Sequence, residues 1–267
     1  MRLQLFSDLH LETETFDPQP APGAEVLVLA GDIDANWTAL ERFAGWPCPV
    51  ISVAGNHEFD GRDLALAWPL LRERCERHGI WLLERESIVL TSATGQQVRF
   101  VGTVRWSDFE LFGAAGRSRA MRAAAYFLQL MAAERGGEPI TPALMRDESL
   151  ACQAWLAAEL QAPNPGPTAP GGWHRTVAIT HFGPSLRSVD PRFGAQPGSA
   201  SFCNADDELI PLADLWLHGH LHCRHDYLVE RPGKLPTRVV SQARGLPRKG
   251  ESEGFNPFKL IELPQNV

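Results

Sequence analysis

Four of the nine histidines in this 267-residue chain lie within eleven residues, in the segment LWLHGHLHCRH (215–225). Imidazole binds transition metals, and it also takes up protons near neutral pH. The cluster therefore predicts either part of a metal site or a solvated, pH-sensitive loop. Metal sites take ligands from several segments, so the choice depends on whether ligand residues occur at comparable places elsewhere.

Matching residue types do occur in four other segments, each directly after a short apolar run. The complete set of candidate ligands is Asp8, His10, Asp32, Asn56, His181, His220 and His222. These side chains offer carboxylate, imidazole and amide groups but no thiolate, a combination that suits Mn, Fe, Zn or Ni rather than a soft metal or a cluster. Residues two apart, such as Asp8 and His10, are expected to point to the same side of an extended segment.

The apolar runs that precede these residues predict buried β-strands. They are residues 2–7, 26–30, 50–54, 176–180 and 213–217. In α/β sheets, loops at the carboxyl ends of strands converge on binding sites, so we expect the candidate ligands to meet there. Glycines before Asp32 and Asn56 would allow sharp turns and a close approach of the backbone.

Other segments predict the elements around this core. Residues 63–79 have the pattern of an amphipathic helix that ends at Gly79, and residues 118–160 form an alanine-rich helical region interrupted by GGEPITP. The segment 80–90 predicts strands that turn near Glu86. Residues 97–106, 237–241 and 259–263 predict further strands. Residues 162–172 predict a surface loop, and the Gly-, Pro- and Ser-rich stretch 181–209 an irregular lip over the site.

Composition excludes several classes of protein. The chain is 44% hydrophobic with a formal charge of −7, which fits a globular protein and argues against non-specific nucleic-acid binding. Its five cysteines are odd in number and lack CxxC spacing, which favours reduced thiols. Neither a signal peptide nor a membrane span is evident. We therefore expect a soluble, cytoplasmic protein that contacts no membrane.

The order of the motifs resembles the signature of the calcineurin-like metallophosphoesterases. The D-x-H motif is Asp8-Leu9-His10, the GD motif is Gly31-Asp32, and the remaining three are residues 55–58 (GNHE), His181 and residues 219–222 (GHLH). The resemblance implies a four-layer αββα sandwich, with two mixed β-sheets flanked by helices. It also implies one domain over residues 1–267, with a helical insert at about 107–172.

The resemblance further implies a centre of two divalent transition-metal ions. One ion would be held by Asp8, His10, Asp32 and His222, and the other by Asp32, Asn56, His181 and His220. A hydroxide bridging both ions would attack phosphorus in line. His57 is implied to be the catalytic proton donor to the leaving oxygen, with an orienting role as the alternative. His218 is expected to be a packed histidine and His225 a solvated one.

Substrate contacts are expected from the lip. Arg187 and Arg192 could bind phosphoryl oxygens, although both could equally be solvated, and Asn204 is a further candidate. The implied function is metal-dependent hydrolysis of a small-molecule phosphate ester, either a diester or a monoester, with nucleotides among the candidates. The alternatives are a nuclease, which needs a positive groove, and a protein serine/threonine phosphatase, which needs a large open groove. A catalytically dead binding protein is disfavoured because every expected ligand is present.

Overall fold

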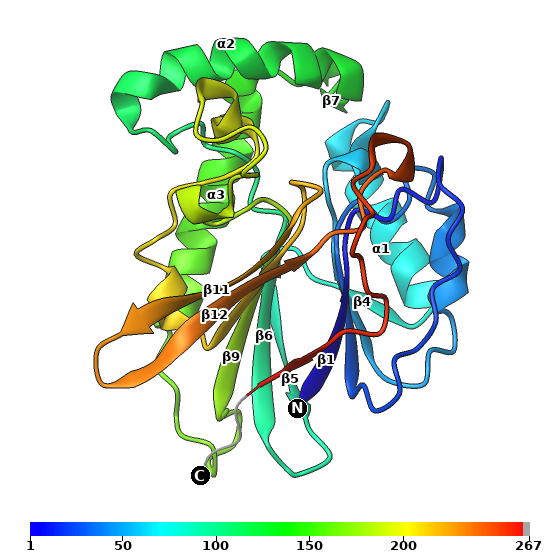
Figure 1. Ribbon diagram of the computed structural model, residues 1–267, viewed down its shortest axis with the longest axis vertical. Coiled ribbons are helices and arrows are strands. Elements are labelled where there is room, and N and C mark those ends of the chain that lie inside the picture. Colours follow the sequence, from blue (N-terminus) through cyan, green and yellow to red (C-terminus); the bar gives the residue numbers. More distant parts are fainter. Residues whose placement is uncertain (264–267) are drawn as a thin grey trace.

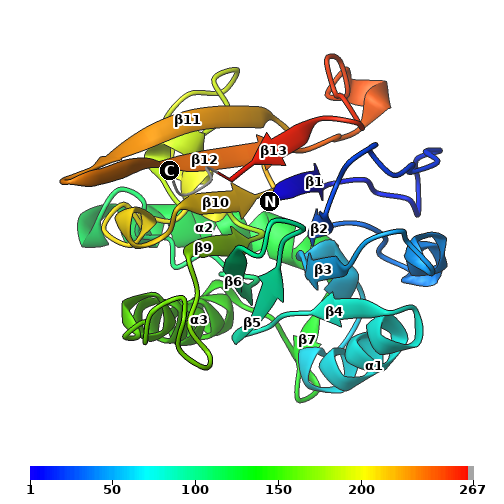
Figure 2. The same cartoon turned by 90° about the horizontal axis from the view of Figure 1, so that it is seen from below.

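The computed structural model describes residues 1–263, and two β-sheets form its centre (Figures 1 and 2). The first sheet has the order β13-β1-β2-β3-β4. Its strands are parallel except for β13, which pairs antiparallel with β1. The strand bounds are β1 (Arg2–Phe6), β2 (Val26–Ala30), β3 (Val50–Val53), β4 (Ile80–Leu82) and β13 (Leu260–Glu262).

The second sheet has the order β11-β12-β10-β9-β6-β5. Its four central strands are parallel, and the edge strands β11 and β5 run antiparallel to their neighbours. The bounds are β5 (Glu86–Thr91), β6 (Gln97–Thr103), β9 (Arg175–Thr180), β10 (Leu215–His218), β11 (Arg224–Arg231) and β12 (Lys234–Gln242). Both sheets are therefore mixed.

Helices cover the outer faces of the two sheets. The inner faces pack on each other through side chains such as Leu5 and Val28 of the first sheet and Phe100 and Ile179 of the second. Helix α1 (Leu64–Arg77) packs on the outside of the first sheet, and α3 (Pro142–Gln161) on the outside of the second (Figure 2). This arrangement confirms the predicted αββα sandwich. The central strands are buried on both faces, which is why they are continuous apolar runs in the sequence.

The segment 107–172 contains most of the remaining helix. It comprises α2 (Ala114–Met131), the small hairpin of β7 (Glu134–Arg135) and β8 (Glu138–Pro139), and then α3. Helix α2 lies across the end of the molecule toward which β1 runs (Figure 1). No helix within residues 1–263 is long and apolar enough to cross a membrane. The short 3₁₀ helices are η1 (Thr38–Phe43), η2 (His57–Phe59), η3 (Leu186–Ser188), η4 (Pro197–Ser201), η5 (Ile210–Leu212) and η6 (Pro247–Lys249).

The strands predicted within 80–90 do not pair with each other. β4 extends the first sheet beside β3, whereas β5 pairs with β6 at the edge of the second. Arg85, which lies between them, has a left-handed backbone conformation with φ of 52°. The chain thus crosses from one sheet to the other at the point where the sequence suggested a turn.

Candidate metal centre

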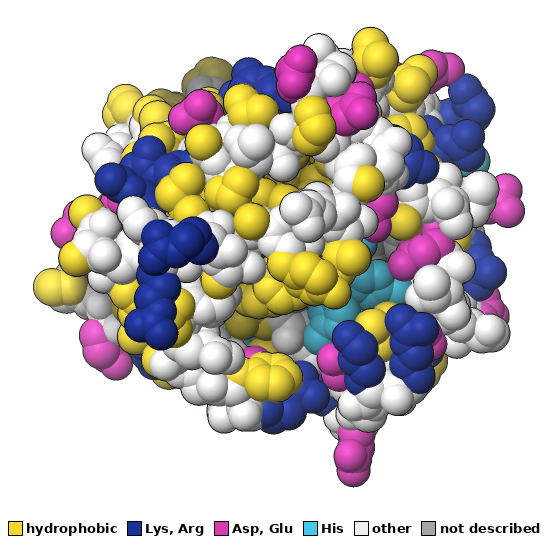
Figure 3. All heavy atoms as spheres, turned by 90° about the horizontal axis from the view of Figure 1, so that it is seen from above, with side chains coloured by type: hydrophobic (Ala, Val, Ile, Leu, Met, Phe, Trp, Pro, Cys, Tyr) yellow, Lys and Arg dark blue, Asp and Glu magenta, His cyan; other side chains and the backbone are white. Residues whose placement is uncertain are grey.

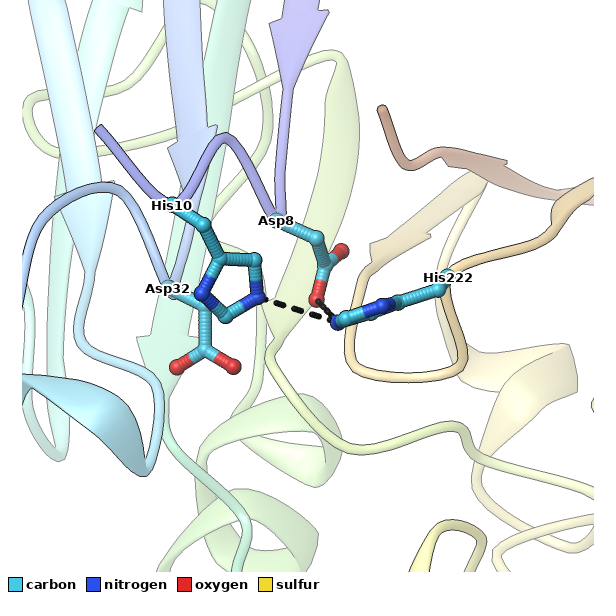
Figure 4. A group of neighbouring side chains, drawn as sticks. All are labelled: Asp8, His10, Asp32 and His222. Atoms are coloured by element: carbon cyan, nitrogen blue, oxygen red, sulfur yellow. Dashed lines mark hydrogen bonds and ion pairs between the residues drawn. The ribbon is translucent and has the colours of Figure 1, made fainter. Parts of the chain in front are cut away.

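The candidate ligands converge at the carboxyl ends of strands from both sheets. Asp8, His10 and Asp32 follow β1 and β2 of the first sheet, and His222 follows β10 of the second (Figure 4). One ligand atom from each of these four residues lies within 4.8 Å of all the others. Asp32, His181 and His220 form a second group within the same limit. Asp32 belongs to both groups.

Left-handed backbone turns aim these side chains. Five of the candidate ligands have positive φ angles, namely Asp8 (53°), His10 (48°), Asp32 (53°), His220 (71°) and His222 (52°). The spacing of the D-x-H and H-x-H pairs predicted extended segments. That prediction is wrong, because each of these residues turns the chain sharply. This conformation costs a non-glycine residue roughly 1–2 kcal/mol, and such strain gathers at functional sites.

Two glycines make the close approach of these segments possible. A Cβ atom on Gly55 would lie 2.1 Å from Oδ1 of Asp32, and one on Gly219 would lie 2.7 Å from Oδ2 of Asp8. Both distances are far shorter than ordinary contacts, so any larger residue would displace the carboxylate. The expectation that Gly55 permits a close backbone approach is confirmed, and Gly219 provides a second close approach that the sequence did not predict.

Hydrogen bonds fix which ring nitrogen of each histidine faces the other ligands. Nδ1 lies 3.0 Å from Glu12 Oε1 in His10 and 2.7 Å from Glu251 Oε2 in His222. In His181 it lies 2.8 Å from the carbonyl oxygen of Ala30. These acceptors place the proton on Nδ1 and leave the lone pair of Nε2 available to a metal.

His220 has the opposite arrangement. Its Nε2 lies 3.2 Å from the carbonyl oxygen of Ser201, so Nε2 donates and Nδ1 carries the lone pair. Its ring packs against Phe182, with centroids 4.1 Å apart, and against Phe202 at 5.0 Å. Burial therefore lowers the pKa of His220 well below its usual value, which keeps the ring neutral.

Three buried polar atoms show that the set fits a cation. Asp32 Oδ2, Asn56 Oδ1 and His181 Nε2 are buried and have no hydrogen-bond partner among the described residues. Asp32 Oδ2 and His181 Nε2 are only 3.1 Å apart but are not aligned for a hydrogen bond. In addition, the Nε2 atoms of His10 and His222 face each other at 3.0 Å. Buried lone pairs left in this way are costly, and a divalent cation would satisfy them.

Glu58 supports the centre from behind. Its carboxylate accepts hydrogen bonds from the backbone N–H groups of Asp32 (3.0 Å), Ile33 (2.7 Å) and Gly55 (2.7 Å). It thereby ties the turns after β2 and β3 together. Burial and the charge of Asp32 raise the pKa of Glu58.

His57 lies beside the centre at the start of η2. Its backbone N–H donates to Asp32 Oδ1 (2.9 Å), and its Nδ1 lies 2.6 Å from Asp60 Oδ2. Although burial alone would lower it, the charges of Asp32 and Asp60 raise the pKa of His57 to about 10. Residues 56 and 57 have helical rather than extended backbone conformations. The side chains nevertheless differ, since the His57 side chain is 39% exposed whereas Asn56 Oδ1 is buried.

The other two histidines of the cluster lie apart from the ligand groups. Burial lowers the pKa of His218 to about 3, and its Nε2 lies 3.1 Å from Ser188 Oγ. The expectation of a packed histidine is thus confirmed. His225 belongs to β11, and its Nε2 lies 3.1 Å from Cys223 Sγ, so it is not a freely solvated loop residue.

The three residues expected to contact substrate differ in their positions relative to the ligands. Asn204 is fully buried, its amide is bonded to the backbone of Arg105, Trp106 and Asp108, and it is not among the residues that line the cavity beside the ligands. Arg187 stacks over the ring of Tyr227 at 4.3 Å. Arg192 does face the site, although both oxygens of Asp190 already accept hydrogen bonds from it.

A cavity of about 460 Å³ opens beside the ligands. Its floor includes Asp32, Asn56, His57, His220 and His222. Much of its wall is apolar, and the surface view shows the histidines in a hollow with hydrophobic side chains on one side and charged side chains on the others (Figure 3). Helix α2 supplies part of this wall, together with residues from 182–202, and Lys249 lies at the edge. The sequence did not single out α2 or Lys249, because nothing in their composition indicates a site.

Comparisons with known proteins support the fold. No family model matches the sequence, and no curated protein matches it either. The solved structure of a phosphopantetheinyl hydrolase from Mycobacterium tuberculosis is similar, with a TM-score of 0.70 over 98% of this chain and 96% of that chain. The chain has the fold of that hydrolase. It is the metallophosphoesterase-type fold that the motif order implied.

Sequence identity to the hydrolase is 19%, so the likeness concerns architecture rather than substrate. A dimetal phosphatase from Danio rerio also matches, at 10% identity over 90% of this chain and 86% of that chain. Its TM-score of 0.31 is too low to indicate a shared fold.

Proposed function

We propose that this chain is a phosphoesterase that uses two divalent transition-metal ions to hydrolyse a small phosphate ester. The observation that carries the proposal is the pair of ligand groups that share Asp32, within which the buried atoms of Asp32, Asn56 and His181 have no partner among residues 1–263. We assign Asp8, His10, Asp32 and His222 to one ion. Asp32, Asn56, His181 and His220 hold the other.

Two bound cations would supply Lewis-acid activation of water and of the phosphoryl group. The residues of this chain then have distinct tasks. Asp32 carries a full charge on two oxygens, which suits a carboxylate shared between cations. Asn56 adds an oxygen without adding charge. Glu12 and Glu251 orient two imidazoles from the side away from the ligands.

His57 is assigned as the proton donor to the leaving oxygen. Asp60 holds its Nδ1, so the Nε2–H is the group available to substrate. The ring lines the cavity, and its centroid is 5.0 Å from that of His10, which places it next to the ligand groups without belonging to either. A bound cation would offset the negative charges that raise the pKa of His57. The pKa would then lie closer to pH 7.

The walls of the cavity favour a small substrate over nucleic acid. A nuclease needs a row of cations along a groove to neutralise successive phosphates. Here Arg192 and Lys249 are the cationic side chains that line the cavity, and Arg192 is already paired with Asp190. A diester or monoester of a small molecule fits this distribution better.

The proposal is tested by metal content and hydrolysis together. Protein reconstituted with Mn²⁺ should bind close to two ions and hydrolyse at least one member of a panel of mononucleotides, cyclic nucleotides, dinucleotides, phosphopeptides and a phosphopantetheinyl ester. Chelation should abolish the activity. Asp32→Asn should reduce metal content more than His222→Asn, because Asp32 belongs to both groups, and the exposed Asp147→Asn should match wild type. Full activity in chelator with at most one bound ion would refute the proposal.

A further inference from the structure

The cavity beside the candidate metal centre is larger and more apolar than a phosphate group requires. Its volume of about 460 Å³ lies within the range of pockets that enclose drug-sized ligands. Asp32 and His220 belong to its lining, together with further charged side chains such as Arg192. The opposite wall consists of Phe127, Leu130 and other apolar side chains of α2.

The apolar wall is open to solvent at its rim. Phe127 is 48% exposed, Leu130 is 64% exposed and Phe193 is 67% exposed. Exposed apolar groups on this scale are unfavourable in water, and contiguous patches of them mark binding surfaces. The three residues line one cavity, so their exposure is concentrated at a single place.

This apolar surface continues beyond the first cavity. A neighbouring hollow of about 290 Å³ shares Phe127, Phe193, Phe202 and Leu221 with it and extends toward Val189 and Gln196. The ring of His220 lies 5.0 Å from that of Phe202, and Phe202 lies 5.8 Å from Phe127. A continuous series of aromatic rings therefore runs from a candidate metal ligand to the outer rim.

We propose that the cavity binds an amphiphilic phosphate ester, with its phosphoryl group at the floor and an aliphatic chain along α2 and Phe202. The polar end of this assignment rests on the proposed phosphoesterase function. The apolar end rests on the wall alone. The juxtaposition of candidate metal ligands and an apolar wall within one cavity matches a ligand with a phosphoryl group at one end and an aliphatic chain at the other.

Binding of alkylphosphonates tests the inference without requiring turnover. Phosphonates carry a non-hydrolysable phosphoryl group, so methyl-, butyl- and octylphosphonate can be titrated into the Mn²⁺-loaded protein by calorimetry. Each methylene that becomes buried should tighten binding by roughly two- to fourfold. We expect octylphosphonate to bind at least about tenfold more tightly than methylphosphonate.

Matched variants locate the effect. Phe127→Ala and Leu130→Ala should each remove a large part of the chain-length dependence and leave the affinity for methylphosphonate unchanged. Phe258→Ala and Leu66→Ala are the controls, because Phe258 is 50% exposed, Leu66 is 69% exposed and neither lines the cavity. All four side chains are substantially exposed, so the fold does not depend on them. A loss in Phe258→Ala as large as that in Phe127→Ala would overturn the assignment.

The outcomes separate this inference from the proposed function. Equal affinities for methyl- and octylphosphonate would overturn the inference and leave the phosphoesterase proposal intact. A further titration uses 1-octanol, which has the chain without the phosphoryl group. If no phosphonate binds but 1-octanol binds in a Phe127-dependent manner, the cavity takes an apolar ligand without a phosphoryl group and this inference is overturned. The phosphoesterase proposal is then decided separately, by metal content and hydrolysis.

Discussion

At the scale of single residues, two histidines of the centre are oriented by carboxylates that contact the side of the ring opposite the other ligands. Glu12 and Glu251 contact Nδ1 of His10 and His222, and the distances of 3.0 and 2.7 Å are those of strong hydrogen bonds. Although burial alone would raise it, the contact with His222 and the N–H of Leu246 lower the pKa of Glu251 to about 2. Glu251 is therefore a carboxylate at neutral pH and makes His222 a better ligand.

A prediction follows for Glu251. Glu251→Gln keeps an acceptor for the Leu246 N–H but removes the negative charge beside His222, so Mn²⁺ affinity should fall by roughly tenfold or more. Calorimetric titration of the metal measures this directly. Glu253→Gln, at an exposed position nearby, should leave the affinity unchanged. Identical affinities in wild type and Glu251→Gln would show that the carboxylate does not act through His222.

His57 gives a second prediction at this scale. A proton donor matters most when the leaving oxygen is basic, so His57→Asn should slow hydrolysis of an alkyl phosphate ester by about 10²–10⁴-fold. Nitrophenyl esters should be affected much less, since nitrophenolate leaves without a proton. Metal content should remain at the wild-type level. The control is His78→Asn at the end of α1, a residue that does not line the cavity. An equal loss on both leaving groups would assign His57 a positioning role instead.

At the scale of elements, the loops over the site are tied to α3 by a buried arginine. Arg105 follows β6 and donates to Asp206 through Nε (2.9 Å) and Nη2 (2.8 Å), and to Asp108 through Nη2 (2.9 Å). It also donates to the backbone oxygen of Ser149 in α3 (3.3 Å). All of these side chains are buried. The single guanidinium therefore connects the segment after β6, the segment around Asp206 and helix α3.

Removal of this arginine should be strongly destabilising. Arg105→Met leaves two carboxylates buried without a cation, and the free energy of unfolding should fall by about 3–5 kcal/mol. Urea denaturation followed by circular dichroism measures the change. Arg119→Met removes an exposed arginine from α2 and should alter the stability by no more than about 0.5 kcal/mol. Similar midpoints for the two variants would mean that the buried network contributes little.

The sequence predicted the elements of the core better than their connections. β1, β2 and β9 are recognisable because they are largely buried on both faces and thus rich in apolar residues, which form an unbroken run in β2. β11 is not, since its sequence RHDYLVER alternates exposed residues with half-buried ones at the edge of a sheet. The change of sheet at Arg85 depends on packing of both sheets, which no local pattern encodes.

In the site, too, some features could be predicted from the sequence and others arise only from the fold. The ligands are recognisable because each follows a strand and has a metal-binding side chain. Glu12 and Asp60 lie two and three residues from the histidines that they contact, and a carboxylate so close to a histidine is a usable signal. Glu251 is 29 residues from His222 and meets it only through the fold. The left-handed backbone of Asp8 and His10 is likewise imposed by the surrounding strands, because neither residue type requires it.

At the scale of the whole molecule, both ligand groups take residues from both sheets. Asp8 and His222 belong to one group although 214 residues separate them in the chain. Cations that bind only the folded chain should raise its stability by about 2.7 kcal/mol at a concentration of 100 times the dissociation constant. The unfolding temperature should therefore rise with added Mn²⁺ and fall in chelator.

Asp32→Asn supplies the control for this effect, because it should lose most of the Mn²⁺-dependent stabilisation, whereas Asp147→Asn should retain it. Calorimetric scans over a range of Mn²⁺ concentrations make the measurement. A wild-type unfolding temperature that does not respond to the cation would contradict a metal centre that spans the two sheets.

The position of α2 has a consequence for how proteins of this architecture can diversify. The candidate ligands lie on turns of the sandwich, where Gly55 and Gly219 leave no room for change. Much of the apolar wall comes instead from α2, which contributes none of the candidate ligands among residues 1–263. Substitutions at Phe127 or Leu130 can reshape the cavity while the turns stay intact. Evolution can thus alter what is bound independently of the chemistry performed on it, and directed evolution of new specificity should begin on this helix.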